Sequence, residues 1–199
     1  MNTQSFAPDE SLRLIRSMID KTRQDISDNS IYFLIWGWGA LIGCIGQFVL
    51  KVVLNYNNHY NIWFVTIICL ILSVYVGIKD RKREKVQTYV GESMGHLWSG
   101  LGITFFVISM IFMRIGWQYC FPFFILLYGL GTFVSGRILK YTPLVIGGCI
   151  SFLLAMISTW VTYDYQMLLA ALALLASYII PGHMLRASYN NAKNKGVAN

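Results

Sequence analysis

The sequence predicts an all-α polytopic membrane protein with six transmembrane helices in three hairpins, preceded by a cytoplasmic amphipathic helix. Of its 199 residues, 56% are hydrophobic and 13% are charged, and the mean hydropathy is +0.53. A bilayer core about 30 Å thick needs about 20 apolar residues in a helix. Apolar stretches close to that length occur at residues 31–54, 62–78, 97–113, 117–135, 143–160 and 163–180. This composition excludes an ordinary soluble domain and leaves little chain for a soluble catalytic one.

The segment before the first span, residues 1–30, has the pattern of an amphipathic helix. Leu12, Ile15 and Ile19 recur at helical spacing, and oppositely charged residues stand four apart beside them. This spacing predicts one apolar face and one charged face. Because acidic and basic residues nearly balance, a strongly anionic surface gains little from the segment. We expect its apolar face to dock on the bundle, on a protein partner or in the headgroup layer.

The distribution of basic residues predicts the orientation. All sixteen Lys and Arg residues except Lys51 and Arg114 lie before the first span, after the last one, or in the connections after spans two and four. By the positive-inside rule, these segments face the cytoplasm. Both termini, including a tail at residues 183–199, are therefore expected in the cytoplasm, with the bundle at 31–182 in a bacterial inner membrane. The net charge of +7 is explained by topology, so no nucleic-acid partner is expected.

Local signals mark several helix ends, and the last two hairpins resemble each other. Thr142 followed by Pro143 is typical of a helix start, as is Asp164, whereas Pro181 followed by Gly182 predicts a stop. A shift of the chain by 46 residues aligns identical residues in the two hairpins, for example Gly102 with Gly148. This similarity predicts repeated hairpins of the same orientation. Glycines in the spans predict close helix packing, within the bundle or between subunits.

The connection after the second span carries a run of bases just inside the membrane. An anionic leaflet attracts each such base by about 1 kcal/mol. The run therefore predicts contact with anionic lipid headgroups, although the same charges also serve simply to fix the topology. The bases in question are Lys79, Arg81, Lys82, Arg83 and Lys85.

The sequence lacks two patterns that are typical of membrane enzymes. It has no His-Glu-x-x-His and no pair of acids within a span. Glu92, His96 and His183 could supply metal ligands, but nothing in the sequence brings His183 to the other two. We therefore expect no enzyme activity, no metal and no cofactor.

The polar residues at membrane depth are uncharged. Each can bond its own helix backbone or a neighbouring helix, and this structural role is the default expectation. If the bundle holds a ligand pocket, it is expected where Gln47, Tyr128, Thr132 and Tyr178 converge, with Thr132 and Tyr178 at equivalent positions of the repeat. Such a pocket would suit an uncharged or lipid-like molecule.

Two short segments resemble a known group of proteins. Glu10-Ser-Leu-Arg-Leu-Ile-Arg-Ser-Met-Ile19 and Phe33-Leu-Ile-Trp-Gly-Trp38 are similar to those of an uncharacterised family of small bacterial inner-membrane proteins, encoded beside winged-helix transcription regulators. The resemblance covers about the first fifty residues and implies a role in a regulated envelope response. The three-hairpin plan is also similar to small acid-stress membrane proteins with six spans, in architecture only. Neither resemblance implies a functional residue.

Together these patterns favour a non-enzymatic accessory or regulatory membrane protein. The amphipathic and charged segments lie on the cytoplasmic side, whereas the spans lack reactive groups. We therefore expect contact with anionic lipids, a protein partner or a second copy of the chain through the first thirty residues and the basic connection. The alternative is a channel or transporter for a small uncharged solute or lipid-like ligand, which the hairpin repeat suggests.

Overall fold

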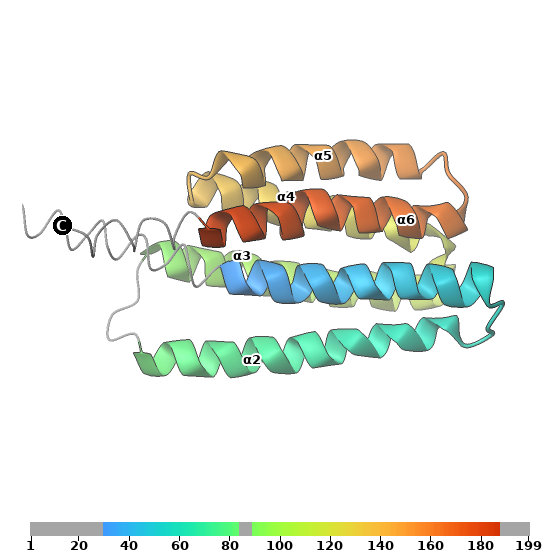
Figure 1. Cartoon of the computed structure of the whole chain (residues 1–199), viewed down its shortest axis with the longest axis horizontal. Helices are drawn as coiled ribbons and strands as arrows, with labels where there is room; N and C mark the ends of the chain where they lie inside the picture. The colour runs from blue at the N-terminus through green and yellow to red at the C-terminus, as the bar shows by residue number, and fades with distance from the viewer. Residues whose placement is uncertain (1–29, 84–88, 188–199) are drawn as a thin grey trace, which may run out of the picture.

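The computed structural model describes residues 30–83 and 89–187, and their side chains at 30–79 and 90–187. The described chain is almost entirely helical and contains no strand (Figure 1). The all-α prediction is confirmed for these residues. The first helix spans Ser30–Val53 and ends in a π-helical turn. The others are α2 (Val65–Arg83), α3 (Tyr89–Ile115), α4 (Cys120–Ile138), α5 (Thr142–Ser158) and α6 (Tyr163–Leu174).

Several helices are extended by short turns of a different helical type, so the apolar helical segments are longer than these bounds. Five segments are long and apolar enough to cross a membrane: Ser30–Val53, His59–Lys79, Val90–Ile115, Trp117–Ile138 and Tyr163–Ala187. Thr142–Ser158 is apolar but shorter. The chain is therefore a multi-pass membrane protein.

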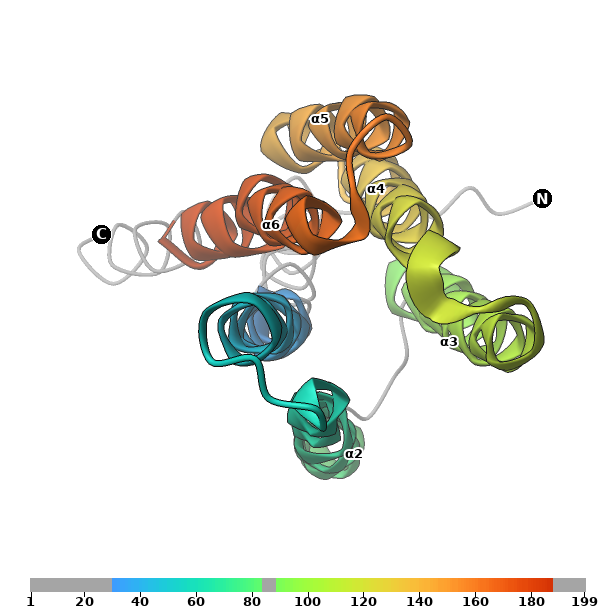
Figure 2. The same ribbon diagram turned by 90° about the vertical axis from the view of Figure 1, so that its right-hand side faces the viewer.

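The helices run roughly parallel to one common axis, in alternating directions (Figure 1). Viewed from the end, α4, α5 and α6 form a group, the first helix lies beside α6, and α2 and α3 flank the bundle (Figure 2). In each span we compare the most apolar stretch of 18 residues. About half of this stretch is buried in the first helix, in α4 and in the last span, compared with 6% in the span that contains α2 and 11% in α3. The bundle therefore has a packed half and two loosely attached helices.

Two adjacent glycines bring α5 close to both of its neighbours. A Cβ atom on Gly148 would lie 2.7 Å from the backbone nitrogen of Phe133 in α4, and one on Gly147 would lie 2.5 Å from the carbonyl oxygen of Ala176. Helices in lipid gain dispersion contacts when small residues allow such an approach. These glycines pack within the bundle, whereas Gly102, which the repeat pairs with Gly148, has nothing within 4 Å.

The predicted helix ends are correct at α5 and wrong at the end of the chain's last span. Helix α5 begins at Thr142 with Pro143 in its first turn, and Asp164 lies in the first turn of α6. Pro181 and Gly182 do not stop the last helix, which continues to Ala187. A π-helical turn at Leu175–Ile179 precedes the proline. Such a turn rearranges the backbone bonds before a proline and lets a membrane helix continue.

Candidate functional site

The cytoplasmic residues predicted from the sequence lie mostly outside the described part. Leu12, Ile15, Ile19 and Lys85 are among the residues that the structure does not describe, and side chains are not described for Arg81, Lys82 and Arg83. Lys79 is exposed near the end of α2. That end lies at the same end of the bundle as the start of the first helix and the end of the last one (Figure 1). We call the opposite end, where the first helix meets α2 and α5 meets α6, the short-loop end.

Three of the four predicted pocket residues lie together. The rings of Tyr128 in α4 and Tyr178 in the last span meet edge to face, with centroids 5.6 Å apart. The hydroxyl of Thr132 is fully buried and donates to the carbonyl oxygen of Tyr128 at 2.8 Å. This hydroxyl is therefore occupied by its own helix, as the default expectation for polar residues in spans supposes.

Other rings surround this pair. Phe33 and Trp98 lie 5.6 Å and 6.0 Å from Tyr178, centroid to centroid, and Phe105 lies 5.2 Å from Tyr128. We call these five residues the aromatic cluster. They come from the first helix, α3, α4 and the last span. Phe33 and Tyr178 are buried, whereas Trp98, Phe105 and Tyr128 are partly buried. Ring pairs at these separations contact one another directly, so the cluster packs these four helices together.

Gln47, the fourth predicted residue, belongs to a different group at the short-loop end. Its side-chain oxygen accepts a hydrogen bond from the indole nitrogen of Trp63 at 2.7 Å. Because an indole N–H only donates, this bond fixes the orientation of the amide. The amide nitrogen then donates to the hydroxyl of Tyr163 at 3.2 Å and faces Nδ1 of His59 at 3.3 Å. We call these four residues the Gln47 network.

An ion pair lies beside this network. Lys51, in the last turn of the first helix, pairs with Asp164 in the first turn of α6. The ammonium nitrogen also lies 4.4 Å from the ring centroid of Tyr163. A cation near a helix C-terminus and an anion near an N-terminus both interact favourably with the helix dipoles. The two side chains remain 33% and 42% exposed, so solvent weakens their attraction.

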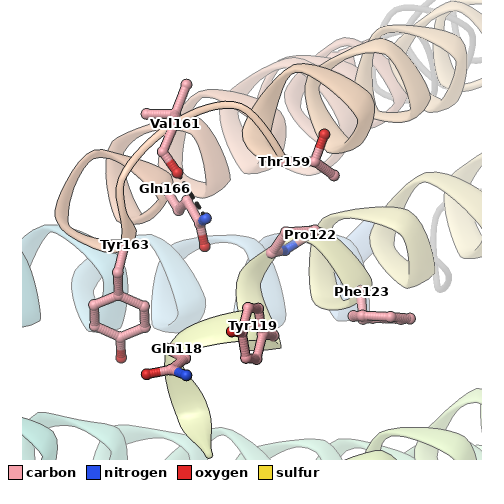
Figure 3. A pocket seen from close by; sticks show the side chains of 8 residues that line it. All are labelled: Gln118, Tyr119, Pro122, Phe123, Thr159, Val161, Tyr163 and Gln166. Atoms are coloured by element: carbon pink, nitrogen blue, oxygen red, sulfur yellow. Dashed lines mark hydrogen bonds between the residues drawn. The ribbon is translucent and has the colours of Figure 1, made fainter.

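An open cleft of about 500 Å³ lies at the same end, between the start of α4 and the loop that joins α5 to α6 (Figure 3). Tyr163 belongs to both the cleft and the Gln47 network. None of the cleft's lining residues is charged. They are Gln118, Tyr119, Pro122, Phe123, Thr159, Val161, Tyr163 and Gln166.

Gln166 has an unusual place in this cleft. The residue is only 7% exposed, and its amide nitrogen donates to the carbonyl oxygen of Val161 at 2.9 Å. Its amide oxygen is buried and has no hydrogen-bond partner among the residues that the structure describes. A buried carbonyl oxygen normally accepts at least one hydrogen bond. Among the residues that line the cleft, this oxygen is the buried polar atom that lacks a hydrogen-bond partner.

Sequence reasoning identified Gln47 but missed its partners and Gln166. It gave Trp63 and Tyr163 no role in a site and assigned Asp164 to a helix start. A polar amide within an apolar span was the signal that could have identified Gln166, because burying an amide in lipid requires a partner. Tyr163 lies 116 residues from Gln47 along the chain, whereas His59 and Trp63 lie in the next helical segment, so no fixed spacing in the sequence could reveal the three contacts together.

Within residues 30–83 and 89–187, no group of three or more His, Cys, Asp or Glu side chains is placed to hold a metal ion. No known protein family, no curated protein and no solved structure matches this chain.

Proposed function

We propose that this chain is a non-enzymatic accessory or regulatory protein of a bacterial inner membrane, with both termini in the cytoplasm. It engages a protein partner or anionic lipid through residues 1–30 and the basic segment from Lys79 to Lys85. It belongs with the small inner-membrane proteins that its first fifty residues resemble. The observation that carries the proposal is the uneven packing. The basic segment joins α2 and α3, the two helices with the least buried surface.

The aromatic cluster supports this function over transport. Its rings contact one another where the first helix, α3, α4 and the last span meet. A transport path for a solute would have to displace these rings, which are held by contacts with several neighbours at once. We therefore expect no solute flux in liposomes that contain the purified protein. A flux abolished by Tyr128→Phe would favour the transporter instead.

The proposal includes six spans in three hairpins. Helix α5 has 17 residues and is about 25 Å long, slightly shorter than a bilayer core. Bilayers thin locally around a short helix at a modest cost, and the close contacts at Gly147 and Gly148 hold α5 between its longer neighbours. In this arrangement the short-loop end faces the periplasm.

Single-cysteine labelling in intact cells tests this topology. In a variant without the four native cysteines, Asn57→Cys should react with a membrane-impermeant maleimide, because residue 57 lies in a connection at the short-loop end. Gln87→Cys, in the basic connection, should react only after the cells are permeabilised. The reverse pattern would place the termini in the periplasm and refute the proposed orientation.

Affinity capture of the full-length protein tests the proposed function. Deletion of residues 1–28 should abolish recovery of a stoichiometric protein or lipid while membrane insertion is retained. The matched control replaces only Arg13 and Ser17, on the charged face of the predicted N-terminal helix, by alanine. Equal recovery from the wild-type and deleted proteins would contradict the proposal.

A further inference from the structure

We propose that the cleft at the short-loop end binds the uncharged, hydroxyl-bearing headgroup of a membrane lipid, with Gln166 as the principal hydrogen-bond acceptor. This site is separate from the cytoplasmic segments of the proposed function. It rests on three features of the described residues: a buried acceptor, an uncharged lining and an apolar track that leads away from the cleft.

The first feature is the orientation of the Gln166 amide. Only its nitrogen can donate to the carbonyl oxygen of Val161, so that bond fixes which way the amide points. Figure 3 shows the amide oxygen turned from Val161 towards the space bordered by Tyr163, Gln118 and Pro122. The oxygen therefore favours a ligand that donates a hydrogen bond.

The second feature is the chemistry of the lining. Amides, hydroxyls and aromatic rings line the cleft, with no charged side chain among them. A charged group in a partly dry site needs a partner of opposite charge. The lining therefore favours a neutral headgroup, such as a sugar, over a phosphate or an ammonium group. Hydroxyls of a sugar can donate to the Gln166 oxygen, and its carbon face can pack against Tyr119 and Phe123.

The third feature distinguishes a lipid from a free sugar. Exposed apolar side chains begin at the residue before α4 and follow one face of this helix away from the cleft, at spacings of four, three and four residues. The residues are Tyr119, Phe123, Leu126 and Leu130, and each is between 43% and 57% exposed. Helical rise places the last of them about 16 Å along the axis from the first, close to half of a bilayer core. An acyl chain of a lipid in one leaflet can lie along this track.

Binding of a defined glycolipid to the purified full-length protein tests the proposal. The probe is monoglucosyl-diacylglycerol, added to protein in detergent micelles and followed by native mass spectrometry. Phosphatidylglycerol and free glucose are the comparison ligands. We expect the glycolipid to bind at least tenfold more tightly than either of them. Equal binding of phosphatidylglycerol, equal binding of free glucose, or no glycolipid binding would each overturn the proposal.

Two variants test the site itself. Gln166→Leu removes the acceptor at similar size and should weaken glycolipid binding about tenfold, the usual scale for one lost hydrogen bond. Gln118→Trp adds bulk at the border of the space that the Gln166 oxygen faces and leaves the bond between Gln166 and Val161 in place. This variant tests the site if Gln166→Leu does not fold. Ser177→Ala is the matched control, because this buried hydroxyl bonds only to Ala173 in the described structure. Wild-type binding by both cleft variants would refute the assignment.

Discussion

Replacing Gln47 by leucine removes the side chain that connects the first helix to Trp63 and Tyr163 while keeping a similar volume. The change leaves the half-buried indole N–H of Trp63 without its acceptor. An unsatisfied buried donor costs about 1–3 kcal/mol, and a lost neutral hydrogen bond to Tyr163 costs about 0.5–1.5 kcal/mol more. Because Trp63 is only half-buried, we expect a loss of about 2 kcal/mol in the free energy of unfolding.

Unfolding in mixed micelles of a mild detergent and sodium dodecyl sulfate, followed by circular dichroism, measures this free energy. A double-mutant cycle with Trp63→Phe isolates the bond, since phenylalanine has no N–H to leave unpaired. We expect the two changes together to cost about 0.6–1.7 kcal/mol less than the sum of their separate effects, the scale measured for polar contacts between membrane helices.

The control is Thr104→Val, which removes an exposed hydroxyl that bonds its own helix at Gly100. This change should alter the free energy of unfolding by less than about 0.5 kcal/mol. A Gln47→Leu variant as stable as wild type, or additive effects of Gln47→Leu and Trp63→Phe, would refute the reasoning about this network.

The helix contacts give further predictions. Gly148→Leu forces a side chain into the backbone of Phe133 and should destabilise the fold by about 3 kcal/mol or more, seen as loss of monodisperse protein on gel filtration. Gly102→Leu, at the open repeat position, should leave the elution profile unchanged, and equal damage by both would contradict this packing. Lys51→Met should lower the free energy of unfolding by at most about 1 kcal/mol, because its pair with Asp164 is partly exposed. That loss should be smaller in 1 M salt, because salt screens exposed charges. A larger loss that salt does not change would contradict the view that solvent reaches the pair.

Much of this fold follows from local patterns in the sequence. Hydropathy and length predict the helices, and Thr142 with Pro143 predicts the start of α5, because each depends on a few neighbouring residues. Pro181 misled the prediction, because the π-helical turn that accommodates it depends on packing around the whole last span. Uniform apolar composition likewise could not predict that α2 and α3 bury so little surface.

The candidate site was predictable only in part, for a similar reason. Tyr128 and Tyr178 were grouped correctly with Thr132 because all three lie at matching depths of their spans. Gln47 was grouped with them, but the side chains that bond it lie at the short-loop end. Depth along a span is read from sequence, whereas the rotation of a helix and its choice of neighbour are set by tertiary contacts.

Photocrosslinking from the N-terminal segment in living cells tests the central claim most directly. A photoreactive amino acid at position 15, on the apolar face of the predicted helix, should yield a discrete crosslinked protein or lipid adduct. The same group at position 17, on the charged face, should yield little or none. No adduct from position 15, or equal adducts from both positions, would contradict the claim that this protein acts by engaging a partner through its cytoplasmic helix.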